Sequence, residues 1–355
     1  NICNILNDKN FKYIRAEDAQ HEGTFTIYVN QLAYCDISYM PKLLFNKMPT
    51  IEINNLLISH PKFILIDIMR QYNDPITSFW RVKKNLLRAN TLMKYYELKF
   101  NSKFTEYKQT NTEMQILEFI RKNIIINSEL IVFGYYAYQY YKYKSTNKEK
   151  QLYVPYYDVI SIDLHNDAKK IYKILSEYNS DIVVEEYHPF YQFFDRRVSF
   201  KLKDKILFNI YGSNNMCIPH WFLDKKKINI VTYPYMIQTF LINNLYHKIF
   251  NNKIEQQNMD YLLENLINYR NKYLKNNNKT VLDNTPFQEF KIECLGNTIE
   301  PSRVHRLALA KAIKNSKPTK KVRYDPTNNK KFDPDIIRFD NIAGKINISN
   351  NRIFY

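Results

Sequence analysis

A pattern of apolar and polar residues occurs twice in this chain, at a constant offset of 173 residues. Residues 25–37 carry it first, with apolar side chains at alternate positions, and residues 198–210 carry it again. Such alternation is typical of a β-hairpin with one buried face, and Asn30-Gln31 supplies the turn of the first hairpin. On the return strand Asp36 points away from the apolar face, toward a cleft or solvent, and the offset maps it onto Asn209.

The same offset continues without a gap into a second element. Residues 57–61 match residues 230–234, and the proline that ends each match opens a segment with apolar residues at helical spacing. Two unrelated αβ segments are the alternative, but chance rarely keeps one register over both elements. The sequence therefore predicts a duplicated α/β fold, with a loop over residues 42–54 and a helix over residues 61–72 in the first copy.

The length of the chain also favours two subdomains, because 355 residues are many for one hydrophobic core. We expect residues 1–110 to hold the C-terminal part of the first copy and residues 111–280 to hold the second copy. Residues 281–355 are predicted to be a basic extension, since ten Lys or Arg and one acid lie between Pro301 and Lys331.

The formal net charge of +17 indicates a polyanionic partner, with RNA or DNA first. One candidate contact surface is a predicted helix over residues 79–100, in which Arg81, Lys84 and Arg88 lie along one face. Three cations at helical spacing can follow a phosphate backbone, although a solvated helix face is the plain alternative. The predicted extension adds candidate RNA-binding residues, namely Arg303, Arg306, Lys320, Lys321 and Arg323.

Several classes of protein are disfavoured by the residues that the chain lacks. It contains only five glycines, and none has the spacing of a P-loop or a dinucleotide-binding fingerprint. Cys217-Ile-Pro-His220 has a spacing seen in metal sites, but no second ligand pair accompanies it. No apolar run approaches the roughly 18 residues of a membrane-spanning helix. The four cysteines have no paired spacing, so we expect them to be reduced, in a cytosolic protein.

The second copy is predicted to run from a strand through a turn at Gly134 into a helix, then to an acid-bearing strand at Asp158 and on to the second hairpin. This order resembles the polymerase-β-type nucleotidyltransferase fold. In that fold a Gly-Ser turn holds a nucleotide phosphate, and three carboxylates on adjacent strands hold two divalent ions. All three carboxylates are needed, because one carboxylate cannot bind both ions.

The two copies differ at these site positions. In the second copy a residue other than serine follows Gly134, and Ile160 stands where the second acid should be. Asp158 can represent the first acid, whereas Asn209 replaces the third. We therefore expect the second copy to be degenerate and non-catalytic, while the first copy keeps the third acid, Asp36, as a catalytic metal ligand.

The offset also predicts where the rest of the first copy's site lies. Applied to Gly134 and Asp158, it places the first copy's Gly-Ser turn and paired acids before residue 1. We therefore expect an upstream N-terminal segment that carries most of the active site, which leaves the activity of residues 1–355 alone open.

Short motifs that point to a family are spread over nearly the whole chain. They are Tyr34-Cys-Asp-Ile-Ser-Tyr-Met-Pro41, His60-Pro61, Asn73-Asp-Pro75, Ser78-Phe-Trp-Arg-Val-Lys-Lys84 and Pro286-Phe-Gln-Glu-Phe290. Together they resemble giant-virus poly(A) polymerase catalytic subunits, distant relatives of the poxvirus enzyme. The resemblance implies template-independent addition of AMP from ATP to RNA 3′ ends, with Mg²⁺ or Mn²⁺. It further implies a homodimer that works in viral factories of the host cytoplasm and is packaged in the virion.

Two other functions remain open from the sequence. A non-catalytic RNA-binding or processivity subunit could use the same duplicated fold, and a structural virion protein is a third reading. An upstream Gly-Ser turn followed by two acids spaced by one residue would favour the polymerase over the processivity subunit. Salt-sensitive binding to RNA would disfavour a structural role.

Overall fold

The computed structural model describes residues 2–18, 24–96, 103–147, 153–214, 216–298 and 343–346. These residues form two compact units, residues 2–45 and residues 46–298 with 343–346. The division that the sequence predicts, at residues 110 and 280, stays a prediction. None of the described helices is both long and apolar enough to cross a membrane.

The smaller unit contains the predicted first hairpin. Helix α1 (Ile2–Asp8) precedes a three-stranded antiparallel sheet of β1 (Arg15–Asp18), β2 (Thr24–Val29) and β3 (Leu32–Ser38), in that order. The turn residues Asn30 and Gln31 have φ angles of 50° and 67°, which is the type I′ geometry that matches the twist of a hairpin. The hairpin and its turn are thus confirmed, but the buried apolar face expected of β3 is wrong, because Ala33 and Ile37 are exposed and Cys35 is half-buried.

The expected loop over residues 42–54 is wrong, because it contains helix α2 (Lys42–Lys47) and strand β4 (Thr50–Ile53). Strand β4 pairs with β5 (Leu56–Ser59) through a second turn of two left-handed asparagines, Asn54 and Asn55. These adjacent asparagines are the turn signal that the prediction overlooked. By contrast, the predicted helix over residues 61–72 has the observed bounds of α3 (Pro61–Tyr72).

The larger unit is built on an eight-stranded mixed sheet in the order β13-β11-β12-β6-β7-β10-β9-β8. Strands β10 and β7 are parallel, as are β12 and β6, and the other neighbours are antiparallel. The strands are β6 (Ile131–Phe133), β7 (Tyr157–Ser161), β8 (Ile182–Tyr187), β9 (Arg197–Leu202), β10 (Lys205–Gly212), β11 (Ile218–Leu223), β12 (Ile228–Val231) and β13 (Cys294–Leu295).

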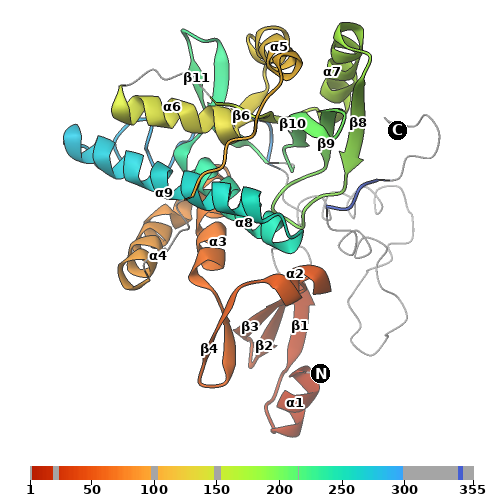
Figure 1. Cartoon of the computed structure of the whole chain (residues 1–355). Helices are drawn as coiled ribbons and strands as arrows, with labels where there is room; N and C mark the ends of the chain where they lie inside the picture. Colours follow the sequence, from red (N-terminus) through yellow and green to blue (C-terminus); the bar gives the residue numbers. More distant parts are fainter. Residues whose placement is uncertain are drawn as a thin grey trace, which may run out of the picture. The chain divides into compact units, whose positions relative to one another are not determined.

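The helices of this unit cover the sheet and pack on one another. Helices α6, α8 and α9 form one packed group (Figure 1), and α3 packs on α8. The tyrosines of α6 belong to this core, since Tyr135, Tyr136, Tyr138 and Tyr141 are buried. The helices are α4 (Val82–Tyr95), α5 (Asn111–Ile120) with a π-helical turn η2 (Arg121–Ile125), α6 (Gly134–Thr146), α7 (Leu164–Tyr178), α8 (Tyr233–Ile249) and α9 (Lys253–Asn276).

The duplication is visible in matching contacts of the two hairpins. In the first, Thr26 lies opposite Asp36, and its hydroxyl donates to the Asp36 carboxylate at 2.6 Å. In the second, Ser199 lies opposite Asn209 and donates to its side-chain oxygen at 2.6 Å. The offset of 173 residues relates both members of each pair. Each hairpin is followed by a second antiparallel hairpin, which was not predicted for the first copy, and then by a proline-led helix, which the repeat predicts.

The expectation that all four cysteines are reduced is wrong for two of them. Cys217 and Cys294 form a disulfide, with a Cα–Cα distance of 5.4 Å. They are 77 residues apart in sequence, and the pairing of β11 with β13 brings them together. Sequence spacing could not predict this bond, because it depends on a tertiary strand pairing. Cys3 and Cys35 are free thiols.

Candidate functional site

Asp36 lies on β3 of the smaller unit with its side chain exposed, as the sequence predicts. Among the described residues, no group of three or more His, Cys, Asp or Glu side chains is placed to hold a metal ion. The oxygens of Asp36 are ligands that Mg²⁺ and Mn²⁺ favour, but a single carboxylate cannot hold two ions. A complete two-ion site therefore needs ligands from outside the described residues, and no catalytic step through metal follows from Asp36 alone.

The three site positions predicted in the second copy lie together in the larger unit. Gly134 starts α6 with a φ of +66°, while Asp158 and Asn209 are paired on the parallel strands β7 and β10. The Asn209 amide donates to Asp158 Oδ1 at 2.9 Å. A Cβ atom at position 134 would lie 2.5 Å from Asp158 Oδ2, so glycine is what allows this carboxyl to approach the turn.

The electrostatic surroundings of Asp158 are those of a buried carboxyl. Burial raises the pKa of Asp158 to about 7, although the hydrogen bond from Asn209 and the charge of Arg197 lower it. The next inward position of the strand is the buried Ile160, which offers no second acid. A carboxyl that is half protonated near neutral pH is a poor ligand for Mg²⁺. That the second copy is non-catalytic stays a prediction, and these features are compatible with it.

The raised pKa of Asp158 makes a prediction about stability. In the folded state the Asp158 carboxyl stays protonated up to about pH 7, whereas in the unfolded chain it has the ordinary aspartate pKa of 3.8. Stability therefore falls as the pH rises from about 4 through 7. Between pH 5 and pH 8 the free energy of unfolding of the wild type should fall by about 2–3 kcal/mol because of Asp158. Asp158→Asn has no titrating carboxyl at this position, so its free energy of unfolding should lack this fall. Denaturant unfolding of both proteins at several pH values measures this, and parallel pH curves would contradict it.

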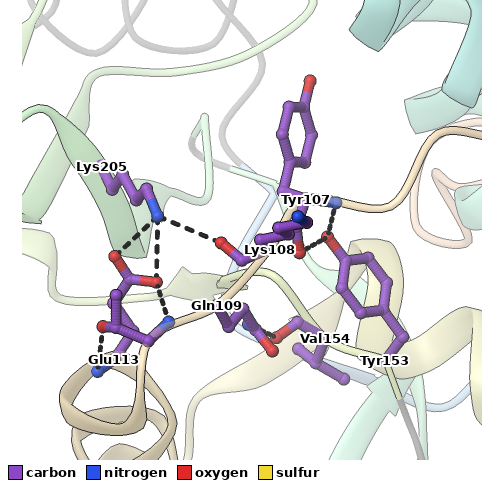
Figure 2. Close-up of polar contacts among 8 residues, drawn as sticks. Tyr107, Lys108, Gln109, Glu113, Tyr153, Val154 and Lys205 are labelled. Carbon is purple, nitrogen blue, oxygen red and sulfur yellow. Dashed lines mark hydrogen bonds and ion pairs between the residues drawn. The ribbon is translucent and has the colours of Figure 1, made fainter.

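Next to these positions is a cavity of about 450 Å³, and the segment between α4 and α5 runs along its rim. Figure 2 shows how this rim is held. Lys205, at the start of β10, pairs with Glu113 of α5 at 2.8 Å and donates to the Lys108 carbonyl at 3.2 Å. The Tyr107 backbone N–H donates to the Tyr153 hydroxyl at 2.6 Å. The rim is thus an ordered part of the cavity wall.

The predicted basic stripe lies on the surface of the larger unit. Lys84 and Arg88 are exposed on α4, and neither forms an ion pair with another described residue. Arg81 ends the 3₁₀ turn before α4, and its guanidinium lies 4.4 Å from the centroid of the Trp80 ring. The five basic residues predicted in the extension, Arg303, Arg306, Lys320, Lys321 and Arg323, lie outside the described residues.

The sequence did not single out the other polar residues that surround Asp158 in the cavity. They include Arg197 of β9, His247 of α8 and Glu255 of α9. No spacing connects them, because they meet through the packing of two helices on the sheet. The one feature of the sequence that could have indicated this site is Arg197, a cation at the start of a largely apolar strand.

Comparison with known proteins identifies the family. Residues 90–355 match the family model described as "APMV, Putative poly(A) polymerase, catalytic subunit, C-terminal". Residues 1–78 match the model described as "Poly(A) polymerase catalytic subunit". The two matches together cover most of the chain.

Individual relatives agree with these matches. The chain is 31% identical, over 97% of its length, to the "Putative poly(A) polymerase catalytic subunit" of Acanthamoeba polyphaga mimivirus, and it covers 66% of that protein. A protein of the same name from African swine fever virus (strain Badajoz 1971 Vero-adapted) is 32% identical over 27% of this chain and 22% of its own length.

A solved structure has the same fold. The crystal structure of the Megavirus polyadenylate synthase matches 89% of this chain and 66% of its own with a TM-score of 0.80, at 27% identity. This chain therefore spans just under two thirds of the length of its mimivirus relative and of this structure. The mixed α/β fold predicted from the sequence is confirmed. The chain belongs to the family of viral poly(A) polymerase catalytic subunits.

Proposed function

We propose that the protein to which this chain belongs adds AMP from ATP to the 3′ ends of RNA without a template, using two divalent ions. Membership of the poly(A) polymerase family supports the reaction. The observation that carries the residue assignment is the matched pair of hairpins. In each copy a hydroxyl on the facing strand donates a hydrogen bond to the residue at this position. That residue is a carboxylate, Asp36, in the first copy and an amide, Asn209, in the second. An amide carries no charge, so only the first copy keeps this metal ligand.

The larger unit indicates how the Asp36 site would be completed. There β10 pairs on one side with β9 and on the other, in parallel, with β7, which carries Asp158. In the smaller unit β3 corresponds to β10, and its edge away from β2 has no partner strand among the described residues. Exposed Leu32, Tyr34 and Ile37 lie on β3. We propose that a strand bearing the paired acids joins this edge, as β7 joins β10.

Within such a site two residues of this chain would have direct roles. Asp36 would bind a divalent ion, and Thr26 would hold the Asp36 carboxylate in place through its hydroxyl. When bound, the two ions would activate the RNA 3′ hydroxyl and neutralise the leaving pyrophosphate. The test is incorporation of labelled AMP onto an RNA oligonucleotide by the complete protein. Incorporation with Mg²⁺ or Mn²⁺ that EDTA abolishes supports the proposal, and metal-independent incorporation contradicts it.

We also propose, from the family resemblance, that the protein is a homodimer in viral factories of the host cytoplasm and is packaged in the virion. Analytical ultracentrifugation of the complete protein tests the dimer. A monomer at micromolar concentration would contradict it.

For RNA binding we propose that the exposed cations of α4 contact phosphates. Each phosphate contact on single-stranded nucleic acid contributes about −0.7 to the slope of log affinity against log salt concentration. We therefore expect Lys84→Ala with Arg88→Ala to flatten this slope by about 1.4 in a salt titration of oligo(A) binding. The matched control is Lys225→Ala with Lys226→Ala, which removes the same charge from the exposed turn between β11 and β12. Equal slopes for the two double variants would show that α4 is a solvated face.

A further inference from the structure

The cavity in the second copy has the composition of a small-molecule site. Its volume of about 450 Å³ lies within the range of ligand pockets, which are mostly apolar with a few fixed polar groups. Aromatic side chains from several elements form much of the wall, among them Tyr156, Tyr187, Tyr211, Tyr246 and Phe250. Planar apolar ligands stack well on such rings.

Arg197 places a guanidinium against this wall, where it forms no ion pair with a carboxylate of the described residues. Its Nε atom is buried and has no hydrogen-bond acceptor, while part of the side chain stays accessible. The guanidinium carbon lies 4.1 Å from the ring centroid of Tyr187 and 5.8 Å from that of Tyr246. By contrast, the neighbouring Arg196 is exposed and pairs with Glu186 at 2.9 Å. The Arg197 guanidinium hydrogen-bonds to Tyr211 and its charge acts on Asp158, but it forms no ion pair with a described carboxylate. A bound anion would therefore compensate this largely buried cation.

Several acids of the cavity already have other partners. Glu113 is paired with Lys205, Asp158 accepts a hydrogen bond from Asn209, and burial raises the pKa of Asp158. Glu255 accepts a hydrogen bond from the hydroxyl of Tyr135 at 3.0 Å, and burial raises its pKa too.

A second nitrogen donor group lies near Arg197. Burial lowers the pKa of His247 to about 4, with a smaller contribution from the Arg197 charge, so its imidazole is neutral at pH 7. A neutral imidazole can donate one hydrogen bond without adding charge. The positive charge among the aromatic rings of the cavity is therefore that of Arg197, with His247 of α8 close enough to be affected by it.

We propose that this cavity binds a nucleoside monophosphate, with the phosphate on Arg197 and the base against the tyrosine rings. A guanidinium is suited to phosphate because its parallel N–H groups can form two charge-assisted hydrogen bonds. The second copy would then be a nucleotide-binding domain that has lost the acids of catalysis. The site requires no metal ion and does not depend on nucleotide addition at Asp36.

The test compares AMP, adenosine and inorganic phosphate by isothermal titration calorimetry on the wild-type chain in EDTA. Hydrogen bonds to a charged group are worth enough that we expect AMP to bind roughly 10- to 100-fold more tightly than adenosine. Phosphate alone should also bind more weakly than AMP, because it lacks the base. Equal affinity for AMP and adenosine would overturn the role of Arg197, and equal affinity for AMP and phosphate would overturn the role of the tyrosines.

A pair of variants locates the binding. Arg197→Met removes the guanidinium with little change in length, and we expect it to weaken AMP binding roughly 10-fold or more while adenosine binding stays the same. Arg196→Met is the matched control, since it removes the same charge one residue away and outside the cavity lining. AMP binding that both variants leave unchanged would place the ligand elsewhere. If Arg197→Met fails to fold, the wild-type comparison of the three ligands decides the question.

Asp36→Asn separates this proposal from the proposed catalytic function. This variant should lose nucleotide addition and keep AMP binding in EDTA. Loss of both properties in Asp36→Asn would contradict a separate site in the second copy.

Discussion

Substituting asparagine for Asp36 in the complete protein is expected to slow AMP addition about a thousandfold, because a metal ligand worth several kcal/mol of transition-state stabilisation is lost. The fold should be unaffected. The side chain is exposed, and the Thr26 hydroxyl can donate to an amide oxygen just as the Ser199 hydroxyl donates to Asn209. The variant thus gives the first copy the arrangement of the second. Single-turnover extension of an RNA primer measures the rate, and thermal unfolding checks the fold.

The control for this result is Asn209→Ala. Asn209 bridges Ser199 and Asp158 in the buried second copy, so its loss should lower stability but leave the rate per folded molecule within about twofold. Near-wild-type extension by Asp36→Asn would contradict the assignment of Asp36. A thousandfold loss in Asn209→Ala would mean that the second copy performs the chemistry.

The largest expected effect on stability is that of Gly134→Ala. A residue with a side chain at a φ of +66° costs about 1–2 kcal/mol in backbone strain. The new Cβ would also lie 2.5 Å from Asp158 Oδ2, so the carboxyl must move and strain its hydrogen bond from Asn209. Losing that bond adds about 1–3 kcal/mol. We expect a total loss of about 3 kcal/mol in the free energy of unfolding, measured by denaturant titration.

A double-variant cycle separates the two parts of this loss. In an Asp158→Ala background the carboxyl that Cβ would meet is absent, so Gly134→Ala should cost only the backbone strain. The same loss in both backgrounds would show that the approach of Asp158 to the turn is not what glycine provides.

Local patterns explain which parts of the fold the sequence could predict. Period-two alternation and a two-residue turn define the first hairpin, and Pro61 fixes the start of α3. The β4–β5 hairpin was missed because its strands of four residues carry little periodicity, although the Asn54-Asn55 turn is a recognisable signal. The disulfide was missed for a different reason, since only the tertiary pairing of β11 with β13 brings its cysteines together.

Some residues of the candidate site could be predicted from the sequence and others could not. The repeat alone aligned Asp36 with Asn209, and the fold resemblance added Gly134 and Asp158, which the structure brings together with Asn209. Arg197 was not foreseen, because its surroundings come from β8, β10 and α8 at once. Burial, and the lack of an ion pair with a described carboxylate, are properties of the folded chain that a lone cation in a sequence cannot reveal.

Poly(A) polymerase activity is tested most simply by primer extension with the complete protein, with Mg²⁺ or Mn²⁺ and each of the four ribonucleoside triphosphates supplied separately. We expect a long product on an untemplated RNA primer with ATP, and little extension with the other three. Absence of extension with every nucleotide, while the protein still binds the primer, would contradict this expectation and identify a non-catalytic RNA-binding subunit.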